Sequence, residues 1–383
     1  MMTPIALRLA FFYAAYFTVI GITLPYWPAW LEGRGLTPVE IGVVLAVGFW
    51  VKLAAHPLMA GVADATGAIK RTTIALAATA TAVFAGFWLA EPFWSFVALA
   101  VLLGFTFQTV LPLGEALALS EIKQRGLDYG VIRIWGSVTF IVAAFAAGAA
   151  AERAGDGIIL ALIIGSMVLL LVSCLVLPTR PARARKAWSW LAAARLLGDR
   201  RYLVFVAAAG AIQASHAVFY GFGTIAWRAQ GFGETAIGVL WAIGVVAEIL
   251  VFALAARLGR FGTAPMLLAL GALGAIIRWP LTAVTEEYLV VAALQMLHGL
   301  TFGAAHLGAM RHLQDNAPEG LEATAQAFYY ALVGGVIMGA AMPAAGVLYE
   351  AWGQAAYLAM GGLGVAGLAA ALLLNATGER SAG

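Results

Sequence analysis

The sequence predicts an all-α integral membrane protein with twelve transmembrane helices in two six-helix repeats of parallel orientation. Of its 383 residues, 63% are hydrophobic and 11% are charged, with a mean hydropathy of +0.93. Soluble domains have about 45–50% apolar and about 25% charged residues. Apolar stretches of about 20 residues, each long enough to cross about 30 Å of hydrocarbon as a helix, recur along the chain. Such continuous runs exclude a membrane barrel, whose strands alternate in polarity.

Short polar turns separate the predicted spans. The spans are expected at residues 6–30, 38–62, 72–90, 93–119, 130–151, 157–177, 202–229, 236–257, 264–284, 288–313, 323–348 and 355–376. The first span is interpreted as an uncleaved helix, because its apolar run is longer than the apolar region of a signal peptide and no small-residue cleavage site follows. The sole cysteine, Cys174, lies inside a span and is interpreted as a packing residue.

One long polar break divides the chain into an N-terminal bundle (1–178), a basic linker (179–200) and a C-terminal bundle (201–383). The linker is rich in arginine, so the positive-inside rule places it in the cytoplasm. Twelve spans then put both termini on the cytoplasmic side of the inner membrane. A nucleic-acid-binding patch is the alternative reading of the linker, but orientation and contact with anionic lipid explain it more simply.

Two segments recur after six spans. IGVVLAVG at Ile41–Gly48 returns as IGVLWAIG at Ile237–Gly244, and LLGFTF at Leu102–Phe107 returns as LHGLTF at Leu297–Phe302. A shift of six spans preserves orientation, so the halves are parallel repeats, the arrangement of major facilitator transporters, with a site expected between the halves. The loop GVADATGAIKRTT resembles that superfamily's cytoplasmic motif, in which Asp64, Lys70 and Arg71 match and would act in gating; Ala65 stands where an arginine is usual.

Ionisable residues inside the spans should carry the chemistry, because each costs about 2.5–3.5 kcal/mol to insert. They are Lys52, His56, Glu115, Arg133, His216, Glu248, Arg278, His298 and His306. Lys52 and Glu248 are 196 residues apart and therefore occupy equivalent positions in the two repeats. For each histidine the alternative is an interhelical hydrogen bond without a transport role.

Helical spacing groups the neighbours of these residues. One stripe holds Gln213, His216 and Tyr220, and another holds Gln108, Pro112 and Glu115, with a kink expected at the proline. Gln295 and His298 share a face. His306 should be rotated from His298 by about 80° at about 100° per residue, so the two histidines need not act on one object.

Several blocks of sequence resemble the phenylpropionate permease family, a proton-coupled branch of the major facilitators. These blocks are Leu24–Gly42, Asp128–Phe140, His216–Phe222, Gly244–Leu254, the pair Arg278–Trp279, and Gln295–Arg311. The likeness extends over nearly the whole chain. It implies symport of a small organic solute with protons.

The more distant lactose permease is similar at its sugar-binding glutamate and arginine, which match Glu115 and Arg133 at the same spacing of 18 residues. Its stacking tryptophan corresponds to Phe140. Its histidine in span ten corresponds to His298, and its arginine in span nine to Arg278 through a gap. Thr301 replaces the proton-carrying glutamate. A threonine cannot carry a proton near neutral pH, so the candidates become His298, Glu248 and His216.

The sequence therefore supports a hypothesis about mechanism. The substrate-binding candidates are Glu115, Arg133, Phe140, Gln108, Lys52, Gln213 and Tyr220, and the proton-coupling candidates are His298, Glu248, His216, Arg278 and His306. Arg133 would bind a carboxylate or hydroxylated solute, and Glu115 would orient Arg133 or accept a solute hydroxyl. Alternatively, Glu115–Arg133 and Glu248–Arg278 are ion pairs that only hold helices together.

The expected substrate is an aromatic carboxylic acid of the phenylpropionate type, with a sugar or a nucleoside as the alternative. A membrane enzyme and a receptor are minor alternatives, because no HExxH motif and no soluble output domain occur. No GxxxxGK[ST] loop occurs, so an ion gradient should drive transport. We expect a monomer in contact with lipid, with no cofactor, no metal and no nucleic-acid partner.

Overall fold

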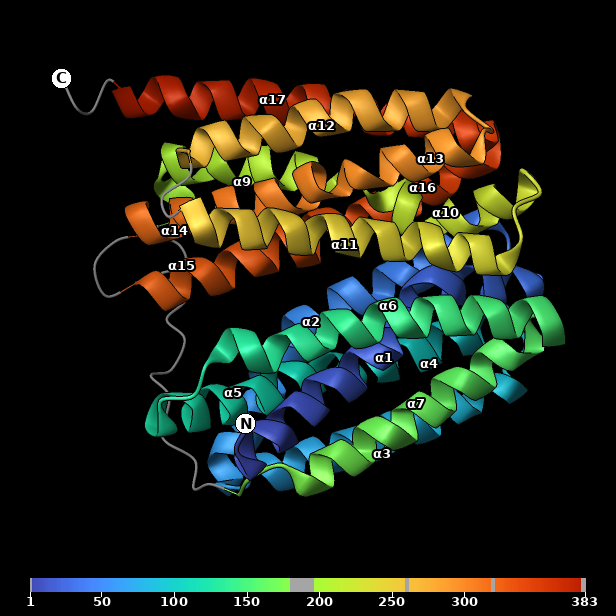
Figure 1. Ribbon diagram of the computed structural model, residues 1–383, viewed down its shortest axis with the longest axis vertical. Helices are drawn as coiled ribbons and strands as arrows, with labels where there is room; N and C mark the ends of the chain where they lie inside the picture. The colour runs from blue at the N-terminus through green and yellow to red at the C-terminus, as the bar shows by residue number, and fades with distance from the viewer. Residues whose placement is uncertain (1, 180–195, 259–261, 318–320, 380–383) are drawn as a thin grey trace. The chain divides into compact units, whose positions relative to one another are not determined.

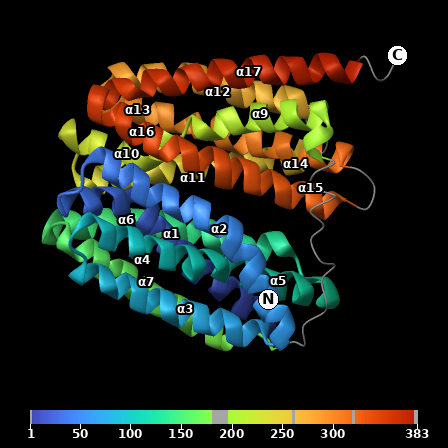
Figure 2. The same cartoon turned by 180° about the vertical axis from the view of Figure 1, so that it is seen from behind.

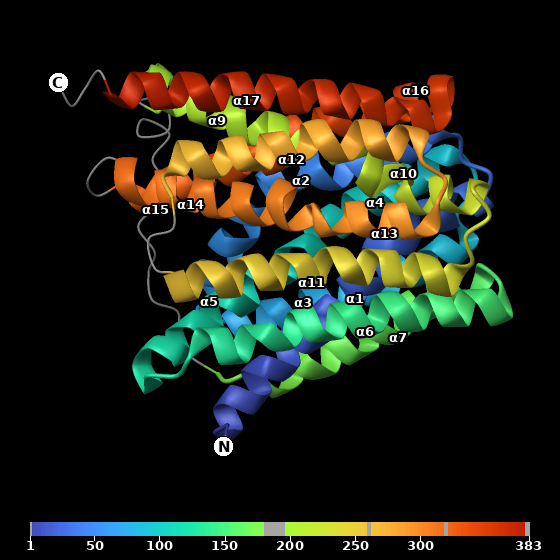
Figure 3. The same ribbon diagram turned by 45° about the horizontal axis from the view of Figure 1, so that its top comes forward.

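The computed structural model describes residues 2–179, 196–258, 262–317 and 321–379, so most of the predicted linker, residues 180–195, lies outside the described part. All regular elements in the described part are helical. Eleven helical runs there are long and apolar enough to cross a membrane. The last, Thr324–Ala376, has 53 residues, and its chain turns back at Gly353, whose φ is 53° (Figure 3). It therefore holds two crossings, in agreement with the twelve predicted.

The helices end within a few residues of the predicted bounds. The first half contains α1 (Pro4–Gly33), α2 (Pro38–Thr66), α3 (Ile69–Gly86), η1 (Phe87–Leu89), α4 (Phe93–Phe105), α5 (Phe107–Arg125), α6 (Tyr129–Ala154) and α7 (Gly157–Val176). The second half contains α9 (Arg200–Ala214), α10 (Ala217–Ala229), α11 (Glu234–Leu258), α12 (Ala264–Val284), α13 (Tyr288–Met296), η2 (Gly299–Ala304), α14 (Ala305–Asn316), α15 (Glu322–Tyr329), η3 (Tyr330–Ile337), α16 (Met338–Trp352), η4 (Gly353–Ala356) and α17 (Tyr357–Glu379).

Local signals in the sequence set the helix starts. Thr37 forms a capping box with Glu40 and is followed by Pro38 at the first helical position of α2. Thr3 and Asp128 cap α1 and α6 through their side-chain oxygens. These residues satisfy backbone N–H groups that the first turn of a helix leaves unpaired. Each helix therefore begins directly after its capping residue.

Packing divides the chain into two compact units. Unit 1 contains Met1–Lys186 together with Trp227–Ala242, and unit 2 contains Ala187–Ala226 together with Ile243–Gly383. Unit 1 thus includes the end of α10 and the start of α11, which the division by sequence repeats assigns to the second half.

In unit 1, α1 packs on α6 and α7, and α3 packs on α7 (Figures 1 and 2). The approach of α1 to α6 depends on Gly21, because a Cβ there would lie 2.6 Å from the carbonyl oxygen of Phe140. An ion-pair network fastens Trp227–Ala242 to this unit. Arg228 donates to both carboxylate oxygens of Asp156, at 2.9 and 2.6 Å, and its Nε lies 2.6 Å from Oε1 of Glu234.

In unit 2, α17 packs on both α12 and α9, and α12 and α9 also contact one another (Figure 1). Aromatic residues from α9 and α15 form much of the buried core at the end of this unit where α9 begins. Tyr202 stacks on Phe328, and Phe205 stacks on Tyr329. Tyr202 also donates a hydrogen bond to the carbonyl of Ala325, so its hydroxyl is satisfied inside the core.

The backbone repeats as the sequence does. Gly35 and Gly231, 196 residues apart, follow the first span of each half and have φ of 85° and 84°. Gly67 and Gly262, 195 residues apart, precede the third span and have φ of 63° and 68°. Positive φ is accessible mainly to glycine, so the same two turns are specified twice.

A close helix contact is also duplicated. A Cβ on Gly104 would lie 2.6 Å from Cβ of Val51, and a Cβ on the equivalent Gly299 would lie 2.8 Å from the carbonyl oxygen of Ala247. Val51 and Ala247 are themselves 196 residues apart. The segments LLGFTF and LHGLTF therefore have the same role. The glycine in each lets the fourth span of its half approach the second span closely.

Candidate functional site

Each unit holds its own cluster of polar side chains within the apolar helices. The cluster in unit 1 is built around Glu115 on α5. Its Oε1 accepts hydrogen bonds from the hydroxyls of Tyr13 on α1, at 3.3 Å, and Tyr129 on α6, at 3.0 Å. Three helices therefore converge on one half-buried carboxylate.

Arg133 on α6 joins this cluster through aromatic rings. Its guanidinium carbon lies 4.0 Å from the ring centroid of Phe17 and 5.4 Å from that of Tyr13. Tyr13 thus lies against Arg133 and donates to Glu115, so a tyrosine links the two residues. The guanidinium therefore lies over aromatic rings, and its N–H groups find no acceptor among the described residues. Such a group can receive a carboxylate edge-on.

Pro112 explains a contact between α2 and α5. Proline has no N–H, so the carbonyl of Gln108, four residues earlier, loses its helical donor. Nε2 of His56 lies 3.0 Å from that carbonyl and donates to it. The sequence shows both residues in spans but not this relation, because it needs the pairing of two helices. His56 thus satisfies a backbone group inside the membrane.

The other predicted residues of unit 1 lie apart from Glu115. Nζ of Lys52 lies 4.4 Å from the ring centroid of Phe49, a cation–π contact one turn before His56. Phe140 is 5% exposed, and its backbone packs on Gly21. Asp64, Lys70 and Arg71 flank the turn at Gly67, which has positive φ as described above.

The cluster in unit 2 is built around Arg278 on α12, a fully buried side chain with 0% exposure. Its Nη1 lies 2.9 Å from Nδ1 of His298 and 3.2 Å from Oγ1 of Thr301. Its Nη2 donates to Oε1 of Gln295 at 2.6 Å. The predicted common face of Gln295 and His298 is confirmed, since both contact this arginine.

His298 lies between Arg278 and Glu248. Its Nε2 is 2.9 Å from Oε1 of Glu248 on α11. Arginine can only donate, so Nδ1 of His298 must accept, and the ring proton must sit on Nε2, facing the carboxylate. A second proton would have to sit on Nδ1, against the guanidinium. The geometry therefore fixes a neutral histidine that donates to Glu248.

His216 stands where the seventh span breaks between α9 and α10. Its Nδ1 is 3.0 Å from the carbonyl of Ile212 and its Nε2 is 3.0 Å from Oγ1 of Thr301. The carbonyl requires a proton on Nδ1, so the threonine donates to Nε2 while it accepts from Arg278. Thr301 thus connects Arg278 with His216. The predicted stripe is present, because Tyr220 stacks on His216 at 5.4 Å and hydrogen bonds with Gln213.

The predicted rotation of His306 away from His298 is wrong. Phe302 stacks on His298 with centroids 5.5 Å apart and planes at 12°, and on His306 with centroids 6.0 Å apart and planes at 6°. The three rings form a ladder along one face. The reason is the π-helix η2, which contains Phe302 and turns less per residue than the α-helix assumed in the prediction.

Sequence reasoning missed Tyr13 and Tyr129 as partners of Glu115. Tyrosines are common in spans, and only helix packing identifies these two. Thr301 was noted only as a replaced glutamate, although it joins two buried side chains, Arg278 and His216, in one network. The signal that the sequence offers is the position of Thr301 three residues after His298, on the same helical face.

Comparisons with known proteins agree with this architecture. The sequence profile described as the MFS_1 like family matches residues 6–359. The chain belongs to this family of major facilitators. This major facilitator is 35% identical over 362 residues to a probable 3-phenylpropionic acid transporter of Escherichia coli (strain K12), covering 92% of the chain and 93% of the relative.

The major facilitator is also similar to other members of the superfamily. It is 31% identical over 385 residues to a maltose permease of Geobacillus stearothermophilus, covering 97% of the chain and 95% of the relative. The structure of the nucleoside transporter NupG matches with a TM-score of 0.84 at 16% identity, covering 97% of this chain and 99% of that one. At that identity the likeness shows the fold alone. The protein is a multi-pass membrane transporter and not an enzyme.

Proposed function

We propose that this major facilitator is a proton-coupled symporter of an aromatic carboxylic acid of the phenylpropionate type, located in the cytoplasmic membrane with both termini inside. The observation that carries the proposal is the environment of Arg133. Its guanidinium lies over the rings of Phe17 and Tyr13, and its N–H groups have no carboxylate partner in the described part of the chain.

Arg133 suits the carboxylate of such a substrate for two reasons. The planar guanidinium offers paired N–H groups that match the two oxygens of a carboxylate. The neighbouring rings of Phe17 and Tyr13 supply apolar and edge-on surface for the substrate's own ring. The relative from Escherichia coli is named for an acid of this chemistry, which supports the assignment.

Glu248 is the group best suited to take up the proton. His298 already presents its only proton to Glu248, and a second proton would face Arg278. The side chain of Glu248 is 19% exposed, whereas the side chain of His298 is 7% exposed. A proton arriving at Glu248 neutralises the carboxylate without displacing either hydrogen bond of the histidine. Arg278, Gln295, Thr301 and His216 then position the histidine and carry no proton themselves.

A hydroxylated solute is the second candidate, and one contact favours it. Glu115 accepts from two tyrosines, and a carboxylate with tyrosine hydroxyls beside it resembles a site for sugar hydroxyls. The relative from Geobacillus stearothermophilus is named a maltose permease, which supports this alternative. The unpaired Arg133 has no comparable role with a neutral sugar.

The test is uptake of radiolabelled 3-phenylpropionate into right-side-out and everted vesicles, with and without a pH gradient. Arg133→Gln is compared with Arg153→Gln, an exposed arginine on the same helix. We expect gradient-dependent uptake that Arg133→Gln reduces by at least tenfold, about the loss of one charged hydrogen-bonded pair, and that Arg153→Gln leaves unchanged. Uptake of maltose but not of the acid would contradict the proposal and establish the second candidate.

A further inference from the structure

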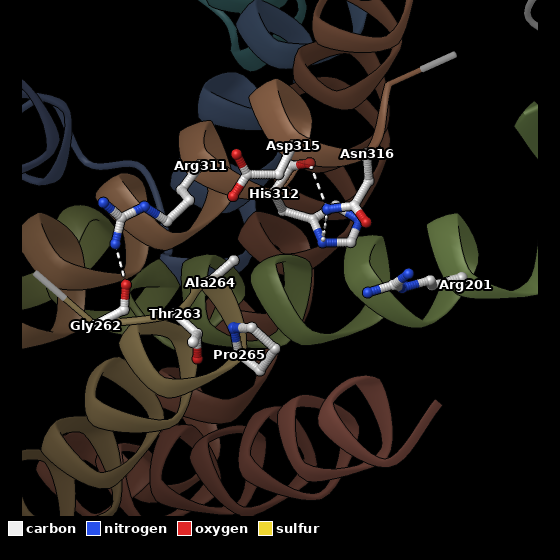
Figure 4. Close-up of a pocket in the computed structure, with 9 residues that line it drawn as sticks. All are labelled: Arg201, Gly262, Thr263, Ala264, Pro265, Arg311, His312, Asp315 and Asn316. Atoms are coloured by element: carbon white, nitrogen blue, oxygen red, sulfur yellow. Dashed lines mark hydrogen bonds between the residues drawn. The ribbon is translucent and has the colours of Figure 1, made fainter. Parts of the chain in front are cut away.

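A cavity of about 330 Å³ lies at one end of unit 2, where α9 and α12 begin and α14 ends (Figure 4). A smaller cavity of about 140 Å³ adjoins it and shares Arg201, His312 and Asn316 with it. Neither cavity contains any residue of the polar cluster around Arg278. The larger cavity is therefore separate from the proposed proton and substrate groups.

His312 brings an unpaired donor to this cavity. The side chain is 3% exposed, and its ring stacks on Phe205 with centroids 4.1 Å apart. Its Nδ1 lies 3.5 Å from the amide nitrogen of Asn316, so this ring nitrogen accepts and the ring proton is on Nε2. Within the described residues Nε2 has no acceptor. This ring nitrogen can therefore donate to a ligand in the cavity that His312 lines.

Arg201 faces the same space. Figure 4 shows its guanidinium directed from α9 toward the centre of the cavity, below His312. Its Nε is buried and has no hydrogen-bond partner in the described part of the chain. A permanent positive charge, a buried Nε–H of Arg201 and the ring N–H of His312 therefore lie at one cavity, and the described residues supply these side-chain groups with no acceptor.

Of the two acidic groups near this cavity, Asp199 is engaged elsewhere. Asp199 caps α9 by accepting from the backbone N–H groups of Arg201, at 2.8 Å, and Tyr202, at 3.4 Å. Asp315 lies on the side of the cavity near Arg311 (Figure 4). Arg311 donates to the carbonyl of Gly262. The remaining space is bordered by Arg201, His312 and the N-terminal turn of the 21-residue helix α12, whose dipole also favours an anion.

We propose that this cavity binds a phosphate group, supplied either by free inorganic phosphate or by the head group of an anionic phospholipid. Arg201 provides paired N–H donors that fit two phosphate oxygens, and Nε2 of His312 donates to a third. The site would hold together the beginnings of α9 and α12 and the end of α14. It is independent of the transported substrate and of the proposed proton group.

The binding test uses the purified full-length protein in a detergent that carries no phosphate. Thermal unfolding is followed while inorganic phosphate is titrated against chloride at constant ionic strength, and in parallel while short-chain phosphatidylglycerol is titrated against short-chain phosphatidylcholine. Arg201→Gln is compared with Arg200→Gln, because Arg200 is the neighbouring arginine, is exposed and lines neither cavity. Arg201→Lys retains the charge and guards against loss of folding.

We expect a saturable rise in the unfolding temperature of the wild type and of Arg200→Gln, with an apparent affinity weakened about tenfold or more in Arg201→Gln and less in Arg201→Lys. A response to both ligands identifies the phosphate group itself, a response to phosphatidylglycerol alone identifies a lipid, and a response to inorganic phosphate alone identifies the free ion. No saturable response to either ligand, or an equal response in Arg201→Gln and Arg200→Gln, overturns the proposal.

Discussion

Arg278 lies 2.9 Å from Nδ1 of His298, the atom on which the histidine would have to carry a second proton. Arginine is a permanent donor, so this contact and a charged histidine exclude one another. The opposite ring nitrogen faces Glu248 at 2.9 Å. The imidazole is thus held as a neutral bridge between a fixed cation and a carboxylate.

This bridge predicts different effects for three substitutions. Glu248→Gln removes the group that takes up the proton, so uptake driven by a pH gradient should be lost while exchange of labelled for unlabelled substrate across the membrane continues. His298→Gln should keep gradient-driven uptake to a substantial degree, because an amide can accept from Arg278 and donate to Glu248. His298→Phe, which can do neither, should lose it.

The measurement compares gradient-driven uptake with counterflow in proteoliposomes, and Glu286→Gln, at an exposed glutamate, is the control. Complete loss of gradient-driven uptake in His298→Gln, with counterflow retained, would show that the histidine itself carries the proton.

Much of this fold could be predicted because it depends on local and repeated signals. Apolar length located the spans, and the spacing of 196 residues placed Lys52 and Glu248 at equivalent positions. Within the candidate site, the sequence identified His216, Arg278 and His298 as unusual residues in spans. It could not identify their partners, because a hydrogen bond between spans depends on helix rotation and depth.

The position of His306 shows why rotation was the weak step. A helix with about 3.6 residues per turn would rotate His306 away from His298 about the helix axis. The π-helix η2 instead brings both histidines onto Phe302. Nothing in LHGLTFGAAH specifies a π-turn by itself. The close approach of Gly299 and Gly303 to Val251 of α11 is a tertiary feature that accompanies it.

The contact between His56 and Gln108 predicts a coupled pair of substitutions. His56→Phe should lower the free energy of unfolding by about 1–2 kcal/mol, because the carbonyl of Gln108 is left without a donor. Pro112→Ala restores the N–H that α5 lacks, so in that background His56→Phe should cost much less. Thermal unfolding of the two single variants and the double variant measures the coupling. Equal costs in both backgrounds would mean that the proline does not explain the contact.

The duplicated helix contact predicts a matched effect in both repeats. Gly104→Ala and Gly299→Ala place a methyl group 2.6 Å from Val51 and 2.8 Å from Ala247, so each should destabilise the protein by about 1–3 kcal/mol. Gly165→Ala is the control, since no atom lies within 4 Å of its added Cβ. Unfolding temperatures in one detergent give the comparison. If one of the two variants is as stable as the wild type while the other is destabilised, the two repeats do not pack alike at this contact.

The ion pair between Arg228 and Asp156 predicts how Trp227–Ala242 is held on unit 1. Two hydrogen bonds of 2.9 and 2.6 Å join the guanidinium to the carboxylate, and Glu234 takes the remaining edge. The Arg228 side chain is 19% exposed, so water replaces these partners only in part. Asp156→Asn should therefore raise the rate of amide hydrogen exchange in Trp227–Ala242 by about tenfold, the effect of losing one charge-assisted pair on local opening. Arg153→Gln, three residues away and exposed, should leave that rate unchanged. If Asp156→Asn exchanges as slowly as the wild type while Arg228→Gln exchanges faster, the pair between Arg228 and Glu234 inside the segment slows its exchange, and the two hydrogen bonds to Asp156 contribute little to holding the segment on unit 1.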